Sequence, residues 1–181
     1  RRRLQTSDAS LAAAIPCGTS VCAEEAQDDS TIEFVACGDF GQDGDNEAAV
    51  AALVKSLDPD FLLWLGDCNY PSGKYETLQA NILKHYAAYV PETAYPAWGI
   101  RDLDTAGDGQ WGKPLLSLFP NIALLNSGKL YYTFVKGEAE FFVINSGYSD
   151  VDPREPDGIQ VGMVQANWIK AAMAASGATW K

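Results

Sequence analysis

The 181-residue sequence contains a single histidine, His85, and no apolar run approaching the roughly 20 residues that a membrane-spanning helix needs. No membrane span is therefore expected. Basic residues are also scarce, because 13 lysines and arginines face 24 aspartates and glutamates and leave a net charge of −11. Such a charge repels nucleic acids and anionic membrane surfaces, so neither is expected as a partner. The sequence also lacks an Asn-X-Ser/Thr acceptor, so it gives no indication of N-glycosylation.

Hydrophobic residues are plentiful by comparison, since they make up 47% of the sequence, and aromatic residues make up 11%. This content is typical of a packed globular protein, and the length suits one well-buried domain. Residues 1–30 differ from the rest, because they are polar, rich in Ala, Ser and Asp, and begin with Arg1 in place of methionine. We interpret residues 1–30 as an N-terminal extension left by a cleavage, and residues 31–181 as the domain.

The four cysteines fall into two pairs. Cys17 and Cys22 lie six residues apart, counting both ends, in the "CGTSVC" segment of the extension, and we predict that they form a disulfide. Cys37 and Cys68 lie in apolar segments and are predicted to stay thiols. A disulfide favours a secreted or lumenal protein, whereas four thiols would indicate a reducing compartment. One histidine and a C-x4-C pair do not supply the four ligands of a zinc site.

The apolar segments from residue 31 onward predict an α/β fold with a mainly parallel sheet. Three β-branched or aromatic runs alternate with two segments of helical periodicity, and short connections join them. This order is typical of parallel βαβ units. The expected strands are "TIEFVACGD" (31–39), "DPDFLLWLGD" (58–67) and "YPAWGI" (95–100), and the expected helices are "DNEAAVAALVKSL" (45–57) and "YETLQANILKHYAAYV" (75–90).

The second half of the sequence predicts a β-hairpin and one long helix. The hairpin is expected over residues 129–147, with its turn at Lys136-Gly137-Glu138. The helix is expected over residues 160–177 and is predicted to stop at Gly177. The final residues, 178–181, have the character of a chain approaching one more strand.

Two successive expected strands end in the same dipeptide, Gly-Asp. These ends, "CGDFG" and "LGDCNY", contain Asp39 and Asp67. In an open α/β sheet, ligands bind beyond the carboxyl ends of the strands, so the two carboxylates are expected to face one crevice. They then need a hard cation, an arginine or lysine, or a shared proton. The alternative is that each aspartate merely caps the loop or helix that follows it.

These segments resemble the calcineurin-like metallophosphoesterases, particularly the purple acid phosphatase-like branch. The likeness starts at "GDFG" and "LVKSLDPDFLLWLGDCNY", continues through "YYTFVKGEAEFFVINSG", "DPREPDGI" and "QANWIKAAMAASGATWK", and covers residues 32–181. It implies a layered α/β sandwich that lacks its C-terminal part. It also implies that Asp39 and Tyr70 hold a first metal, that Asp67 bridges to a second, and that a pair of Fe, Zn or Mn ions activates a water.

The third motif departs from the family. The family has Gly-Asn-His followed by Asp or Glu, whereas "PAWGIRDLD" places Ile100 and Arg101 at the Asn and His positions and keeps Asp102. Isoleucine has no lone pair for a metal, and arginine stays protonated and cannot act as an acid or base near neutral pH. The later histidine motifs of the family have no counterpart in these 181 residues.

Two functions follow from this pattern. The first is a catalytically degenerate module that serves a structural, assembly or partner-binding role, with no cofactor or a single divalent metal. The alternative is the N-terminal piece of an active metal-dependent phosphatase, a phosphomonoester hydrolase completed by residues beyond Lys181. In either case we expect the sheet flank near Ala178–Lys181 to be covered by the rest of the chain or by another protein chain.

Arg101 is the residue on which the crevice prediction depends. We predict that its guanidinium pairs with Asp67 and takes Asp39 or Asp102 as a second acceptor, because a planar fork of donors can neutralise two carboxylates. Asn69 and Ile100 are expected to line the same crevice. The alternative has Arg101 in solvent and leaves one cation, such as Ca²⁺ or Mg²⁺ with waters, on the carboxylates.

Overall fold

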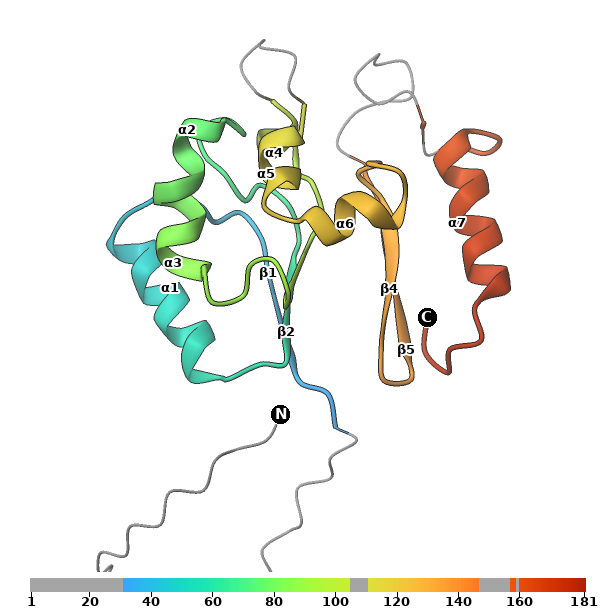
Figure 1. The fold of residues 1–181 in the computed structure, drawn as a ribbon, viewed down its shortest axis with the longest axis horizontal. Helices are drawn as coiled ribbons and strands as arrows, with labels where there is room; N and C mark the ends of the chain where they lie inside the picture. Colours follow the sequence, from blue (N-terminus) through green and yellow to red (C-terminus); the bar gives the residue numbers. More distant parts are fainter. Residues whose placement is uncertain (1–30, 105–110, 147–156, 159) are drawn as a thin grey trace, which may run out of the picture. The chain divides into compact units, whose positions relative to one another are not determined.

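The computed structural model describes residues 31–104, 111–146, 157–158 and 160–181 (Figure 1). Residues Ile32–Lys181 form one compact unit. In the described part of the chain no helix is long and apolar enough to cross a membrane. The predicted Cys17–Cys22 disulfide and the rest of the N-terminal extension lie outside the described residues.

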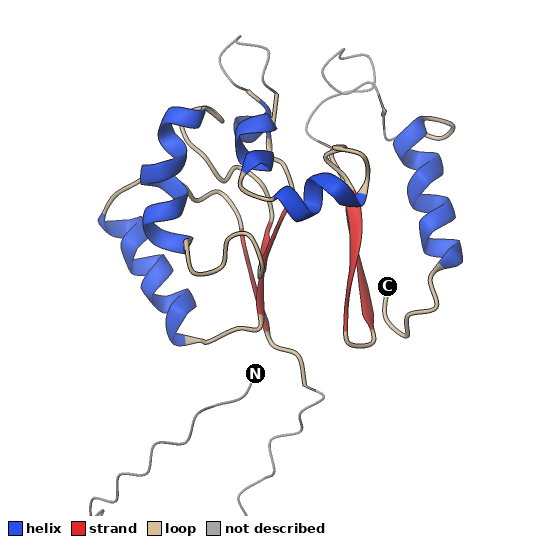
Figure 2. Cartoon of the chain, in the orientation of Figure 1, coloured by secondary structure: helices blue, strands red, loops and turns tan. Residues whose placement is uncertain are grey.

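The unit is mixed α/β, as predicted, and contains a three-stranded parallel sheet in the order β1-β2-β3 (Figure 2). The parallel pairs align Phe34 with Phe61 and Leu62 with Ala94. A helix connects β1 to β2, and a helical segment of three successive parts connects β2 to β3, so both predicted βαβ units are confirmed. The elements are β1 (Phe34–Cys37), α1 (Asp45–Ser56), β2 (Phe61–Trp64), α2 (Tyr75–Leu78), η1 (Gln79–Leu83), α3 (Lys84–Tyr86) and β3 (Ala94–Pro96).

Two element boundaries differ from the sequence prediction. β3 is only three residues long, and Ile100, expected at the end of this strand, instead begins the short helix α4 (Ile100–Leu103). The helix expected over residues 75–90 ends at Tyr86, and its middle part, η1, is a π-helix that separates two short stretches of regular α-helix. Two further short helices, α5 (Lys113–Ser117) and α6 (Pro120–Leu125), were not predicted; each has a proline in its first turn, where a missing N–H costs nothing.

The predicted hairpin is confirmed. It consists of β4 (Tyr132–Lys136) and β5 (Ala139–Val143), which pair antiparallel with Lys136 opposite Ala139. Helix α7 (Val164–Ala175) ends two residues before Gly177, which was expected to stop it. The chain then pairs parallel to β5 through one bridge between Trp180 and Ala139, so the approach to another strand is present.

Aromatic side chains join the hairpin to one face of the parallel sheet and the helices to the other. Because successive strand residues point to opposite faces, the side chains of Phe61 and Trp64 in β2 lie on opposite faces of the sheet. Phe61 contacts Phe134 of the hairpin with ring centroids 5.9 Å apart, whereas Trp64 contacts Phe40 and Tyr86 on the helical side at 5.3 and 5.9 Å. Both faces of β2 are therefore buried, which explains its continuous apolar sequence.

Candidate metal and binding site

The two Gly-Asp dipeptides lie where β1 and β2 end, and both aspartates have left-handed backbone conformations. The φ angles are 56° at Asp39 and 53° at Asp67. A residue other than glycine in this region is uncommon, although aspartate tolerates it better than most, and such residues gather at functional sites. The surroundings hold the conformation, because the N–H of Asp39 donates to the carbonyl of Gly66 at 3.0 Å and so ties the first loop to the second.

The three predicted metal ligands come together at this point. The phenolic oxygen of Tyr70 lies 3.3 Å from Asp39 Oδ1 and 3.3 Å from Asp67 Oδ2. One hydroxyl has one proton, so it can donate to only one of the two carboxylates at a time. Burial, followed by the charges of Asp67 and Asp39, raises the pKa of Tyr70 to about 12. The three oxygens form an anionic cluster suited to a hard cation.

Glycines allow the loops at the strand ends to approach this closely. A side chain at Gly41, where φ is +79°, would place its Cβ 1.8 Å from the carbonyl oxygen of Cys68. A side chain at Gly99 would place its Cβ 2.1 Å from Asp67 Oδ1. Neither distance is possible between non-bonded atoms, so the glycines of the motifs are required by the packing of one loop on the next.

The third loop contributes a backbone donor in place of the predicted guanidinium. The N–H of Arg101 donates to Asp67 Oδ1 at 2.8 Å, while the Arg101 side chain is exposed. Its guanidinium forms no ion pair with any carboxylate of the described residues. The prediction that the Arg101 guanidinium bridges Asp67 and Asp39 is therefore wrong. The reason is that α4 begins at Ile100 and turns the free N–H groups of its first turn toward Asp67. Ile100 is itself 51% exposed.

Asp102 is buried, so it is not available as a second acceptor for Arg101. The carboxyl group is 0% exposed; Oδ1 accepts the N–H of Cys68 at 2.9 Å and Oδ2 accepts the N–H of Gly99 at 3.0 Å. Burial raises the pKa of Asp102 to about 7, against the lowering effect of these two hydrogen bonds. Asp102 thus joins the second loop to the third and does not face the cluster of Tyr70.

Asn69 was also expected in the crevice, but it is fully buried. Its Nδ2 donates to the carbonyl of Lys74 at 2.9 Å, and its Oδ1 accepts from Thr77 Oγ1 at 2.8 Å and from Asn81 Nδ2 at 2.9 Å. These bonds occupy the amide, so Asn69 supports the second loop from within the protein and offers no free ligand to a metal.

A groove of about 580 Å³ opens beside Asp39 and Tyr70, along the segment that joins β1 to α1. It is acidic, because three further carboxylates contribute to its wall. This part of the site was not predicted, although the "GQDGDNE" segment directly after "CGDF" could have indicated it. The lining residues are Asp39, Phe40, Gln42, Asp43, Gly44, Asp45, Asn46, Glu47 and Tyr70.

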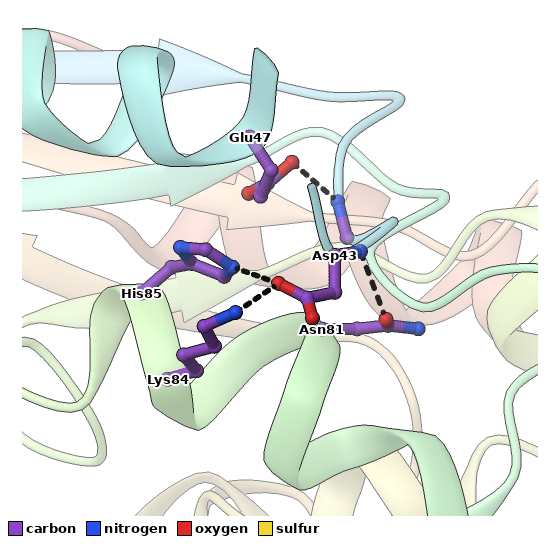
Figure 3. A network of polar contacts seen from close by, with 6 residues as sticks. Asp43, Glu47, Asn81, Lys84 and His85 are labelled. Atoms are coloured by element: carbon purple, nitrogen blue, oxygen red, sulfur yellow. Dashed lines mark hydrogen bonds and ion pairs between the residues drawn. The ribbon is translucent and has the colours of Figure 1, made fainter. Parts of the chain in front are cut away.

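The lone histidine, His85 of α3, contacts this segment at Asp43 and does not contact the cluster of Asp39, Asp67 and Tyr70. His85 Nε2 lies 3.0 Å from Asp43 Oδ1, and Lys84 Nζ lies 2.6 Å from the same oxygen (Figure 3). The His85 side chain is only 5% exposed, so its imidazole is enclosed by the protein beside Asp43. The hydrogen bond from Lys84, then that from His85, lowers the pKa of Asp43.

Cys37 and Cys68 are free thiols, as predicted. Burial is the main cause that raises the pKa of Cys37 to about 11 and the pKa of Cys68 well above its usual value. Because the thiolate is the reactive form, both groups are poor nucleophiles and poor metal ligands. They belong to the packing of the first two loops.

The side chains present fit one cation but not two. Among the described residues, no three side chains of the His, Cys, Asp and Glu types converge on a common point, so a metal at this place requires the phenol of Tyr70 as third ligand beside Asp39 and Asp67. Ile100, which begins α4 beside Asp67, has no donor atom to offer a metal. No protein-family model matches the sequence, and no curated protein matches it.

Proposed function

We propose that this chain carries a degenerate metallophosphoesterase-like module, of the calcineurin-like and purple acid phosphatase-like type, that serves a structural, assembly or partner-binding role. The site is proposed to hold a single divalent cation through Asp39, Asp67 and Tyr70. The observation that carries this proposal is the position of the Tyr70 hydroxyl, 3.3 Å from both carboxylates, beside a third loop without a metal ligand.

The arrangement of the elements supports the family assignment within this proposal. The two Gly-Asp motifs lie at neighbouring strand ends of a parallel sheet, and a hairpin packs on the sheet face opposite the helices. The motif glycines are also in close contact, as a compact ligand-bearing edge requires. The exposed side chain of Arg101 favours the alternative in which a cation neutralises the carboxylates over the one in which the guanidinium does.

The chemistry of the third loop supports a binding role over hydrolysis. Two-metal hydrolysis needs ligands for both ions, and Ile100 supplies none. Arg101 stays protonated and cannot relay a proton to a leaving group. With one bound cation, the charge of the two carboxylates is offset and the remaining coordination positions are open to water or to an oxygen ligand of a partner. The acidic groove beside Asp39 then becomes the surface that a partner meets.

The experiment measures metal content and hydrolysis on the same protein. Chelator-stripped chain is titrated with Mn²⁺ or Mg²⁺ by calorimetry and assayed with p-nitrophenyl phosphate. We expect one cation per chain and no metal-dependent hydrolysis. Asp67→Asn should weaken cation binding at least tenfold, whereas Asp60→Asn, which alters a carboxylate bonded to the N–H of Glu33 away from the cluster, should not.

Other outcomes separate the competing functions. Hydrolysis that requires metal and is lost in Asp67→Asn would establish the alternative, an N-terminal piece of an active phosphatase. Absence of any bound cation would disprove the cation site. The proposed cover of the flank near Ala178–Lys181, where Trp180 is 70% exposed, is tested by ultracentrifugation, in which a stable monomer of this chain contradicts it. The secreted or lumenal localisation remains a prediction that depends on the Cys17–Cys22 disulfide.

A further inference from the structure

The helical segment between β2 and β3 contains a π-helix, η1, with Asn81 at its centre. The segments α2, η1 and α3 follow one another without a break over residues 75–86. A π-helix adds a residue to a helical turn, and such insertions occur frequently at functional sites. Asn81 is only 6% exposed, so the inserted turn carries a polar amide inside the protein. Because a buried amide needs hydrogen-bond partners, those partners show what it holds.

The Asn81 amide bonds to both loops that carry the predicted cation ligands. Its Oδ1 accepts the N–H of Asp43, in the loop after β1, at 3.1 Å. Its Nδ2 donates to the carbonyl of Tyr70 at 2.6 Å and to Asn69 Oδ1 at 2.9 Å, both in the loop after β2. Figure 3 shows the Asn81 side chain extending from its helix to the backbone of Asp43. One side chain therefore joins two loops that are far apart in the sequence.

The same two loops also touch each other directly at Gly41. The N–H of Tyr70 donates to the carbonyl of Gly41 at 2.9 Å, and the N–H of Gly41 donates to Glu47 Oε2 at 3.0 Å. The N–H of Asp39 forms a second backbone contact between the loops, with the carbonyl of Gly66 at 3.0 Å. Asn81 adds a side-chain connection at Asp43, further along the first loop. Since Asn81 bonds to main chain and to Asn69, it acts on the Asp39 and Tyr70 side chains only through the loops.

Asparagine is the residue type that this position requires. This position requires an acceptor for the N–H of Asp43 and a donor for the Tyr70 carbonyl and Asn69 Oδ1. A primary amide has both groups in one plane. Aspartate would place a carboxylate against the Tyr70 carbonyl. Leucine of similar size would remove the partner of the Asp43 N–H and of the Tyr70 carbonyl, and would leave Asn69 Oδ1 with Thr77 alone.

We infer that Asn81 is the positioning residue of the cation site, because it fixes the loop of Asp39 against the loop of Tyr70. This inference rests on the proposed function for the cation itself, but the coupling of the two loops is a separate claim. Asn81 raises the cation affinity by holding the ligand oxygens close together before the cation arrives, which removes the ordering cost from binding.

The test uses the full 181-residue chain, Mn²⁺ as the metal, and a matched control. Asn81→Leu removes the hydrogen bonds that the amide makes to the two loops, and Asn81→Ser is the second variant if the first does not fold. Gln165→Leu is the control, because Gln165 is also a buried amide with two main-chain bonds, to the N–H and C=O of Asn145 at 2.7 and 2.8 Å, but it joins α7 to the end of β5. Both variants should lower the melting temperature.

Two readouts separate positioning from stability. We expect Asn81→Leu to weaken Mn²⁺ binding at least tenfold and to speed iodoacetamide labelling of the buried thiol of Cys68, measured by mass spectrometry, whereas Gln165→Leu changes neither more than twofold. Equal losses of melting temperature with unchanged Mn²⁺ affinity in both variants would overturn the inference. If wild-type protein binds no Mn²⁺, the proposed cation site fails, and Cys68 labelling alone decides whether Asn81 couples the loops; unchanged labelling then rejects the coupling.

Discussion

The loops after β2 and β3 each contain a glycine that is followed by an aspartate, yet the two aspartates, Asp67 and Asp102, have different surroundings. Asp67 is partly exposed, has a left-handed backbone, and faces the hydroxyl of Tyr70. Asp102 is 0% exposed and accepts two backbone N–H groups. Local sequence does not distinguish the proposed cation ligand, Asp67, from the structural carboxyl group of Asp102. Burial does, because a carboxyl group that is 0% exposed and turned toward main-chain N–H groups is not accessible to a cation in the groove.

The same comparison explains why Arg101 is exposed. The buried carboxyl group of Asp102 in the third loop accepts the N–H of Cys68 in the second loop. On the exposed side, the N–H of Arg101 donates to Asp67. The backbone therefore forms the contact that was expected of the side chain. Substitutions at four positions test this difference between the loop of Asp67 and the loop of Asp102.

The largest effect is expected where two loops touch through a glycine. Gly41→Ala introduces a Cβ 1.8 Å from the Cys68 carbonyl oxygen in a left-handed backbone, and we expect it to destabilise the protein by about 2–5 kcal/mol. Gly128→Ala is the control, because Gly128 has a similar φ of +77° but open space around it, and about 1–2 kcal/mol is expected there. Urea denaturation measures both; equal losses would show that the loop contact at Gly41 is not tight.

The next largest effect on the free energy of unfolding is expected at Asp102, and it depends on pH. Asp102→Asn keeps the shape but replaces one side-chain oxygen, which accepts a backbone N–H, with an NH₂ donor, and this should cost about 1–3 kcal/mol at pH 5. The folded-state pKa of Asp102 is raised to about 7 from 3.8. Its contribution is therefore fully present below about pH 4 and is lost as the pH rises toward 7, because the unfolded carboxyl ionises first.

The measurement for Asp102 is the difference in unfolding free energy between wild type and Asp102→Asn, taken from pH 4 to pH 8 with chelator present. Wild type should lose stability relative to the variant across this range. A difference that is constant with pH would contradict a buried, late-ionising carboxyl group. Asp60→Asn, which alters an exposed carboxylate bonded to the N–H of Glu33, is the control variant.

A smaller effect separates the backbone of Arg101 from its side chain. Arg101→Ala keeps the N–H that donates to Asp67 and should change stability by less than about 0.5 kcal/mol. Arg101→Pro removes that N–H within the first turn of α4, where proline is otherwise tolerated, and should cost about 1–2 kcal/mol. Thermal unfolding of both variants checks this. A large loss in Arg101→Ala would restore the guanidinium bridge.

The smallest effect is expected at the surface ion pair beside the site. Lys84→Met removes the ammonium that contacts Asp43 at 2.6 Å, but the Lys84 side chain is 57% exposed. Solvent and salt screen such a pair, so the change in stability should stay below about 1 kcal/mol and shrink in 0.5 M NaCl. A loss larger than that of Arg101→Pro would show that the ion pair holds the loop more firmly than backbone bonds do.

The sequence predicted the elements of the site better than its details. The Gly-Asp repeats placed Asp39 and Asp67 at neighbouring strand ends, because alternating strands and helices force a parallel sheet. The hairpin over β4 and β5 followed from its two apolar runs and the glycine between them. The positions of Asn69, Asp102 and Arg101 could not be predicted, because which side of a short loop faces the interior depends on what packs against it.

Sequence alone therefore determined which residue types reach the carboxyl edge of the sheet, since strand and helix periodicity follow from local apolar patterning. It also determined that Ile100 and Arg101 supply no metal ligand, since that is a property of the side chains. Only the tertiary structure decided which carboxylates stay accessible, and it placed Asn81 of η1 between two loops. The physical reason is that burial and hydrogen-bond satisfaction depend on neighbours distant in the sequence.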